Sequence, residues 1–336
     1  MRSETSAAGR SGDASAWLAL GLVQELSPRR AHELVARFGS PEDVLAAPAR
    51  LLAEAGLSDA VVQALGDAPA RAPREAARVA AAGATLVVWP DDRYPASLRQ
   101  IPDPPLVLAV RGTLVAEDDI AIAVVGARRA SEYGRRVAGE LASDLARSGV
   151  TVVSGLAAGI DAAAHRGALV TEFPCGAPPL AFHFPRRNRV ISGLASGTVV
   201  VEAAEESGSL ITAQHAVEQG RDVFAVPGPL GPGHRGPHRL IREGATLVTG
   251  AEDILAGLGR DLVARLAAAR AAAAETTLTT DERRVLAGVG TDGGHVDEVI
   301  RRAGLPAAHA LETLLALELR GLVAQLPGKR FRRQAA

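Results

Sequence analysis

Residues 120–134 read IAIAVVGARRASEYG, and this stretch places an apolar run directly before a glycine and a helix start. The first six residues are all aliphatic, which is typical of a strand buried on both faces. Gly126 opens a loop, and a helix is expected from about Tyr133 to Ser148. A strand that runs through a glycine loop into a helix is the repeating unit of a parallel α/β sheet.

The same unit recurs along the middle of the chain. Further strands are expected at 84–90, 106–110, 150–153, 198–202 and 222–226, with helices after Ser154 and over 211–219. This alternation predicts an α/β fold with a Rossmann-like, doubly wound, mostly parallel sheet. Ligands of such sheets bind beyond the strand ends, so Gly126, Ser154 and residues 202–207 should meet at one edge.

The pattern divides the chain into five segments. They are a disordered tail over 1–15, a helical module over 16–80, a Rossmann-like core over 84–258, a linker over 259–277 and a winged helix over 278–334. Short helices joined by glycines indicate that the module is SAM-like or helix-hairpin-helix-like. Such modules contact either the DNA backbone or another protein, and the sequence leaves both open.

The C-terminal segment has the order of a winged helix. Helices are expected after Thr279-Thr280-Asp281, over 295–303 and over 306–319, followed by a two-stranded wing that ends in Lys329-Arg330-Phe331-Arg332-Arg333. The third helix would read a DNA groove in helix-turn-helix proteins, but here it lacks cationic residues. Protein contact or auxiliary backbone contact is therefore favoured over sequence readout.

Composition limits the kinds of site the chain can hold. The 336 residues carry a net charge of −1, so a nucleic-acid site must be a local patch. Cys175 is the only cysteine, which excludes a disulfide framework and a paired-cysteine zinc site. The sequence shows no secretory signal and no apolar run of membrane-spanning length, so we expect a cytoplasmic protein without a membrane segment.

Two polar tracts are candidates for binding a phosphate chain. FPRRNRVIS occupies 184–192, and SGSLIT occupies 207–212. Arginine supplies charge and a donor fork, hydroxyls donate hydrogen bonds, and glycine lets backbone N–H groups approach a phosphate. A solvated arginine face is the plainer interpretation, but it explains neither the Phe-Pro before the tract nor the hydroxyl-rich turn after it.

These tracts resemble the DNA-processing protein A family (DprA/Smf). The chain also has VVGARRASEYG at 124–134 and SGLAAGID at 154–161 with His165, then Arg221, Pro227-Gly228 and Leu240-Ile241, in the order of the family's motifs. The resemblance implies a homodimeric, non-catalytic protein that binds single-stranded DNA during natural transformation, protects it and helps to load a RecA-type recombinase. No cofactor and no metal are expected.

Together, the residues and the resemblance predict one groove for single-stranded DNA. Arginines would bind phosphates, hydroxyls and glycine backbone would fill the gaps, and Phe184 would be either a base-stacking ring or a buried anchor. The predicted DNA-binding residues are Gly126, Arg128, Ser131, Ser154, Gly155, Phe184, Arg186, Arg187, Asn188, Arg189, Ser207, Gly208, Ser209 and Thr212.

The chain departs from the family pattern in four places. Ala158 stands where the family usually has Arg, Glu206 where it has Lys or Arg, and His238 where Asn is common. The first two changes remove positive charge near the groove. In addition, the comparison with the family pattern predicts that one strand–helix unit of about thirty residues is missing after Leu169, so a smaller sheet is expected.

Other functions fit the sequence less well. A dinucleotide site would need GxGxxG after the first strand, but Gly126 is followed by two arginines. A phosphoribohydrolase of the cytokinin-activating type would show a PGGxGTxxE tract, which 227–231 lacks. Asp161 with His165 suggests structural support rather than acid–base catalysis, and Pro and Gly around His234 and His238 argue against a metal site. A protein-binding adaptor that has lost DNA binding remains the third class.

Overall fold

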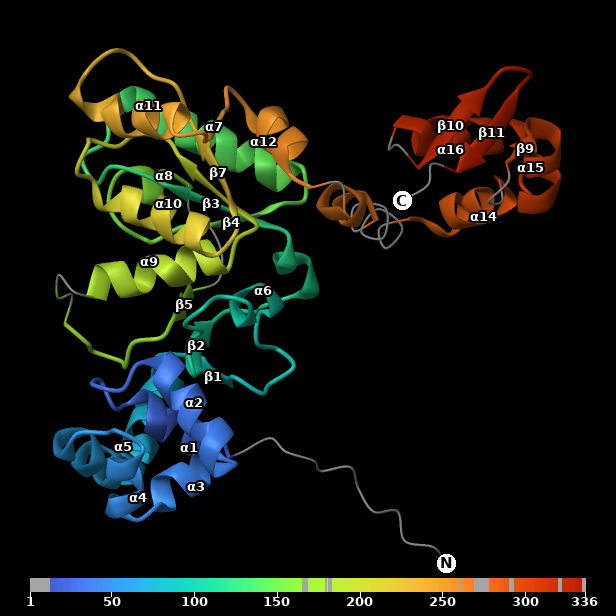
Figure 1. Ribbon diagram of the computed structural model, residues 1–336. Helices are drawn as coiled ribbons and strands as arrows, with labels where there is room; N and C mark the ends of the chain where they lie inside the picture. The colour runs from blue at the N-terminus through green and yellow to red at the C-terminus, as the bar shows by residue number, and fades with distance from the viewer. Residues whose placement is uncertain are drawn as a thin grey trace, which may run out of the picture. The chain divides into compact units, whose positions relative to one another are not determined.

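The computed structural model describes residues 13–164, 169–178, 180, 183–259, 261–268, 278–289, 293–319 and 322–333. His165 of the motif above lies outside these ranges. The chain forms two compact units, one up to Gly257 and one from Leu258 onward. Figure 1 shows the helices and strands of both units.

The elements of the first unit alternate as the sequence predicted. Its helices are α1 (Ala14–Gly21), α2 (Pro28–Phe38), α3 (Pro41–Ala46), α4 (Ala49–Glu54), α5 (Asp59–Ala81), α6 (Ala96–Arg99), α7 (Glu132–Arg147), α8 (Ile160–Ala164), α9 (His183–Gly193), α10 (Gly208–Glu218), α11 (Arg235–Arg242) and α12 (Ala251–Gly257). Its strands are β1 (Thr85–Val88), β2 (Val107–Arg111), β3 (Ala121–Val125), β4 (Thr151–Val153), β5 (Leu169–Thr171), β6 (Gly197–Val200), β7 (Asp222–Ala225) and β8 (Thr246–Leu247).

Five strands form the parallel sheet that the sequence predicted. Their order is β4-β3-β6-β7-β8, and every neighbouring pair is parallel. Numbered along the chain within the sheet, this is the order 2-1-3-4-5, which is also what the Rossmann order 3-2-1-4-5-6 becomes when its third strand is left out. The sheet is therefore as small as the sequence predicts.

An open trough lies beside β4. Its volume is about 1580 Å³, and its walls come from α7, α8, α9, β4, β5 and the loops near residues 92–97 and 113–119. The residues of β4 are only half-buried, whereas all of β3 is buried. The shortened sheet thus closes around its core but keeps a half-exposed edge.

The sequence did not predict the second sheet of this unit. Strands β1, β2 and β5 form an antiparallel sheet in which Thr85 pairs with Val110 and Ala109 pairs with Thr171. The next described strand after α8 is β5, which belongs to this antiparallel sheet and not to the parallel one.

Helix α9 lies between the two sheets (Figure 1). Ile191 packs with Ala121 and Ala123 of the parallel sheet, whereas Val190 packs with Leu108 of the antiparallel sheet. The other face of the antiparallel sheet packs on the helical module: side chains of β1 and β2 join the core of α1 to α5. The first unit is therefore a stack of layers with α9 in its middle.

The helical module starts earlier and runs longer than the sequence predicted. Asp13 caps α1 by accepting from the Ser15 N–H, so this helix begins inside the predicted tail. Helix α5 continues through Pro69 and Pro73 and ends at Ala81. Its buried residues recur along one side and hold the helix in the module core.

The second unit contains the winged helix. Its elements are α14 (Thr280–Val289), β9 (Gly294–His295), α15 (Val296–Ala303), α16 (Ala307–Leu319), β10 (Val323–Leu326) and β11 (Arg330–Arg333). Thr279 and Glu282 form a capping box at α14. Residues 261–268, in the predicted linker, are helical.

None of the helices in the described parts of the chain is long and apolar enough to cross a bilayer.

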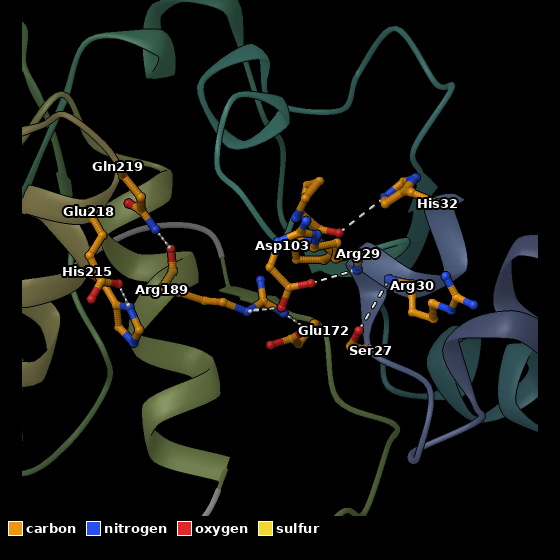
Figure 2. Close-up of polar contacts among 12 residues, drawn as sticks. Ser27, Arg29, Arg30, His32, Asp103, Glu172, Arg189, His215, Glu218 and Gln219 are labelled. Atoms are coloured by element: carbon orange, nitrogen blue, oxygen red, sulfur yellow. Dashed lines mark hydrogen bonds and ion pairs between the residues drawn. The ribbon is translucent and has the colours of Figure 1, made fainter. Parts of the chain in front are cut away.

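A buried ion cluster joins the core to the helical module (Figure 2). The Arg189 guanidinium contacts Glu172 at 2.5 Å and Asp103 at 3.2 Å, and only 8% of the arginine side chain is exposed. Asp103 also accepts the backbone N–H of Arg29, the second residue of α2, at 2.7 Å. One arginine thus ties α9 to the loop before β2 and, through Asp103, to the module.

Removal of this arginine should destabilise the first unit in a pH-dependent way. Arg189→Met should lower the free energy of unfolding by about 3–5 kcal/mol, because it leaves a buried carboxylate without its partner. Burial already raises the pKa of Glu172, and loss of Arg189 raises it further. A carboxyl with a raised folded-state pKa loses its stabilising contribution as pH rises through that value, so the defect should grow as pH rises from the ordinary range of a carboxyl through the raised pKa of Glu172.

Urea unfolding at several pH values measures this effect. Arg136→Met, on the exposed side of α7 and in an ion pair with the exposed Glu140, is the control and should change stability little. The double variant Arg189→Met/Glu172→Gln should recover much of the loss. A defect that is the same at all pH values, or no recovery in the double variant, would contradict the ion-cluster account.

Candidate nucleic-acid interface

The ends of β3, β4 and β6 meet at one edge of the parallel sheet, as expected for this fold. Gly126 follows β3, Ser154 follows β4, and Glu202 follows β6. The Ala127 N–H donates to the Glu202 carbonyl at 2.6 Å, and the Ser154 hydroxyl donates to the Val124 carbonyl at 2.8 Å. These bonds join the loops that leave the strands into one rigid surface.

Asp161 holds this surface from below. Only 4% of the residue is exposed, and its carboxylate accepts the backbone N–H groups of Gly126, Gly155 and Ala157. Burial raises the pKa of Asp161, while Arg187 and the three donors oppose that rise. The sequence identified this residue only as structural support, and the contact with Gly126 could not be read from the sequence because Gly126 lies in the loop after another strand, β3.

Gly155 is required by packing as well as by its place in the motif. A Cβ atom there would lie 2.7 Å from the Asp161 carboxylate and 2.9 Å from the Arg187 guanidinium. Its carbonyl accepts a hydrogen bond from Arg187 at 2.9 Å. The glycine therefore lets a carboxylate and a guanidinium approach the same peptide from two sides.

Two arginines and one phenylalanine form the cationic part of the surface. The guanidinium carbon of Arg128 lies 4.2 Å from the centre of the Phe184 ring, and that of Arg187 lies 5.6 Å from it. Arg128 is exposed, Arg187 is half-buried, and burial lowers the pKa of Arg187. Phe184 is half-buried, so the ring serves as a support for two charges rather than as a bare stacking platform.

The other residues of the 186–189 tract point elsewhere, because the tract is helical. Arg186 lies over the Phe173 ring at 5.5 Å. Asn188 is buried and donates to the Gly208 carbonyl at 3.1 Å, which ties α9 to the start of α10. Arg189 is committed to the ion cluster, so the prediction that it binds a DNA phosphate is wrong for this structure. Its burial leaves no surface for a ligand.

The predicted hydroxyl donors are mostly used inside the protein. Ser207 caps α10, and its hydroxyl lies 2.8 Å from that of Ser209. Thr212 is 2% exposed, because the first turn of α10 directs it inward, so it cannot reach a ligand. Gly208 is exposed at the helix start. Among the SGSLIT residues, only those at 207–209 reach the edge of the surface.

A carboxylate occupies the start of α7, where a Rossmann protein would bind a pyrophosphate. The Ser131 N–H and hydroxyl donate to Glu202 at 3.1 Å and 2.7 Å, and Ser131 caps α7 by accepting from the Gly134 N–H. Glu202 is 5% exposed. The positive end of the helix dipole therefore already interacts with a carboxylate of the protein. That carboxylate opposes binding of the pyrophosphate of a dinucleotide at this point.

The two histidines that might have suggested a metal site have other contacts. His238 Nε2 lies 3.1 Å from the Gly228 carbonyl, and buried His234 packs edge-on against Tyr133. Within the part of the chain that the structure describes, no three His, Cys, Asp or Glu side chains are placed to hold a metal ion.

The fold and the site define a Rossmann-like α/β protein that has arginines at its strand ends and no phosphate loop for a dinucleotide. The profile of DNA recombination-mediator protein A matches residues 85–172 and 165–259, and that of the DprA winged helix domain matches 269–329. The chain belongs to the DprA/Smf family. The two core segments meet at 165–172, where the sequence predicted the missing unit.

Individual relatives agree with this assignment. Protein Smf of Escherichia coli is 42% identical over 287 residues, covering 72% of this chain and 76% of the relative. DNA processing protein DprA of Bacillus subtilis is 38% identical over 220 residues, covering 54% and 74%. The X-ray structure of DNA processing protein A from Streptococcus pneumoniae matches with a TM-score of 0.60 at 30% identity, covering 72% of this chain and 96% of that one.

Replacement of Asp161 tests whether it holds the strand-end loops. Asp161→Asn keeps the size of the side chain but removes one acceptor and the charge, leaving buried N–H groups unpaired at a cost of about 1–3 kcal/mol. We expect faster hydrogen exchange at the amides of Gly126, Gly155 and Ala157. Asp144→Asn, on the exposed side of α7, is the control. Unchanged protection in Asp161→Asn would show that the carboxylate does not hold these loops.

Proposed function

We propose that this protein binds single-stranded DNA during natural transformation and recombination, protects it, and helps to load a RecA-type recombinase. The observation that carries the proposal is the pair of guanidiniums of Arg128 and Arg187 on Phe184 at the strand-end edge. Two fixed positive charges on one aromatic ring suit a phosphodiester chain, because arginine binds phosphate through a planar donor fork.

The local balance of charge supports binding by a patch. The whole chain has a net charge of −1, so DNA would find no general attraction to it. At the strand-end edge, the two buried carboxylates are already engaged: Asp161 by backbone N–H groups and Arg187, and Glu202 by Ser131. The exposed charged side chains of the loops after β3 and β6 are Arg128, Arg129, Glu205 and Glu206, and Arg187 is half-buried.

The proposal is for a binding protein without catalysis. The polar groups at the edge bond to one another, and Asp161 faces backbone donors and an arginine rather than a nucleophile and a base. Phosphate contacts and ring support carry no base sequence information, so binding should be largely independent of sequence.

Three further elements of the proposal come from the family. The relatives in Bacillus subtilis and Streptococcus pneumoniae are named as DNA processing proteins. By analogy, we propose a homodimer formed through the Rossmann-like core, contact with a RecA-type recombinase, and action in the cytoplasm. The winged helix would contact protein rather than read DNA, since α16 has no arginine or lysine.

Fluorescence anisotropy with a labelled single strand of mixed sequence tests the proposal. About two phosphate contacts, to Arg128 and Arg187, predict a salt slope near −1.4 and a roughly sevenfold loss of affinity from about 50 to about 200 mM salt. The same sequence as a duplex should bind less tightly. Arg128→Glu should weaken single-strand binding by about tenfold and reduce the slope.

Arg50→Glu is the matched control for charge, because Arg50 is exposed on the helical module and 87% of its side chain is accessible. It should leave DNA binding unchanged. A folded, monodisperse protein that binds no oligonucleotide would overturn the proposal and favour the adaptor function. Equal losses of DNA affinity in Arg128→Glu and Arg50→Glu would show that binding depends on the net charge of the protein and not on this patch.

Restoring a missing charge should strengthen binding. Ala158 is exposed in the loop between β4 and α8, at the position where the family resemblance expects arginine. Ala158→Arg should raise single-strand affinity by roughly threefold and make the salt slope more negative by about 0.7, the value for one added phosphate contact. Ala53→Arg, exposed on α4, should change neither quantity. An unchanged slope in Ala158→Arg would place the DNA elsewhere.

A further inference from the structure

Leu156 has an unusual backbone conformation for its residue type. Its φ is 56°, and among the described residues only Lys329 shares a positive φ without being a glycine. Lys329 lies in the turn of the wing hairpin between β10 and β11, where such angles are normal. Leu156 lies in no hairpin. It follows Gly155 directly after β4, in the loop that carries the proposed DNA surface.

The side chain of Leu156 is also unusual for a leucine. It is 55% exposed, more than most of the large hydrophobic side chains in the described part of the chain. The residue therefore gains little from burial, while its backbone is in a region that glycine or asparagine would occupy with less strain. Stability of the free protein does not explain a leucine here.

The structure holds this conformation firmly. The N–H groups on either side of Leu156, those of Gly155 and Ala157, both donate to the buried Asp161 carboxylate. The Gly155 carbonyl is held by Arg187 at 2.9 Å. The leucine is thus presented on a fixed loop, and strain that is held in this way is typical of ligand-contacting positions.

The surroundings of Leu156 suit a nucleobase. The neighbouring residue is bonded to Arg187, one of the two arginines proposed to bind phosphates, so a base attached to such a phosphate is within reach of the leucine. Leu156 also lines the trough beside β4, together with Val190 and Ile191 of α9. A base that turns toward the trough would contact Leu156 with one face and the apolar side chains of the trough with the other.

We propose that Leu156 packs against the face of a nucleobase of the single strand whose phosphates lie on Arg128 and Arg187. The proposal rests on the proposed function and adds the first base contact to it. Leucine is among the apolar side chains that proteins insert between bases. Contact with a base face tolerates any sequence, so the leucine adds affinity and a preference for unpaired bases without sequence readout.

Two variants separate this role from a structural one. Leu156→Gly and Leu156→Asn both suit a positive φ, so their melting temperatures should equal or exceed that of the unchanged protein. Their affinity for a single strand should nevertheless fall roughly fivefold, in keeping with the loss of one base contact. Their salt slope should stay the same, because no charge is removed. Leu156→Met keeps an apolar side chain and should keep most of the affinity.

An oligonucleotide with abasic sites at all internal positions supplies the second readout. The unchanged protein should bind it roughly fivefold more weakly than the normal strand, whereas Leu156→Gly should bind both strands alike. Hydrogen exchange at Gly155 and Ala157 checks that the loop in Leu156→Gly remains protected.

The outcomes distinguish this inference from the proposed function. If the unchanged protein binds the normal strand with the expected salt slope but Leu156→Gly and Leu156→Asn bind as tightly, the base contact is disproved and the proposed function stands. If neither the unchanged protein nor the variants bind any strand, the proposed function fails and the inference fails with it.

Discussion

The burial of α9 between two sheets determines what each residue of the arginine tract does. Successive residues of a helix are turned by about 100°, so four polar side chains in a row cannot share one ligand. Arg187 turns to the strand-end loops, Asn188 to α10, Arg189 to the buried carboxylates and Arg186 to the Phe173 ring. A tract that looks like one cationic cluster in the sequence therefore divides into one ligand-facing arginine and two residues that fix its helix in place.

Most of the fold could be predicted from the sequence, and less of the site. Strand and helix positions follow from local periodicity, which is why the parallel sheet and the winged helix were predicted correctly. The direction of a side chain depends on what packs around its helix, so the burial of Arg189 and Thr212 could not be foreseen. The antiparallel sheet was missed for a related reason: β5 pairs with β2, about sixty residues earlier in the chain. The roles of Asp161 and Leu156 likewise need the loop geometry.

The β4 edge of the parallel sheet links two features of the core. β4 pairs only with β3 in that sheet, and an open trough lies beside it. The next described strand after α8 is β5 of the antiparallel sheet, and Glu172, directly after β5, contacts Arg189. A strand–helix unit missing after Leu169, as the sequence predicts, would account for both features. The trough is lined by Gly155 and Leu156, so the open edge adjoins the proposed DNA surface.

The Glu202 carboxylate at the start of α7 determines which kind of anionic ligand this core can bind. A Rossmann protein that binds a dinucleotide buries the pyrophosphate against helix N–H groups, which favour an anion of compact size. Here those groups already face a carboxylate from β6's end, so a phosphate that entered would meet a negative charge. Positive charge lies instead on Arg128 and Arg187, on side chains supported by a ring rather than in a backbone cradle. A surface of that kind cannot enclose a single phosphate pair, but it can bind successive phosphates of a chain that passes over it. The internal carboxylate therefore favours an extended polymer over a small nucleotide as the ligand.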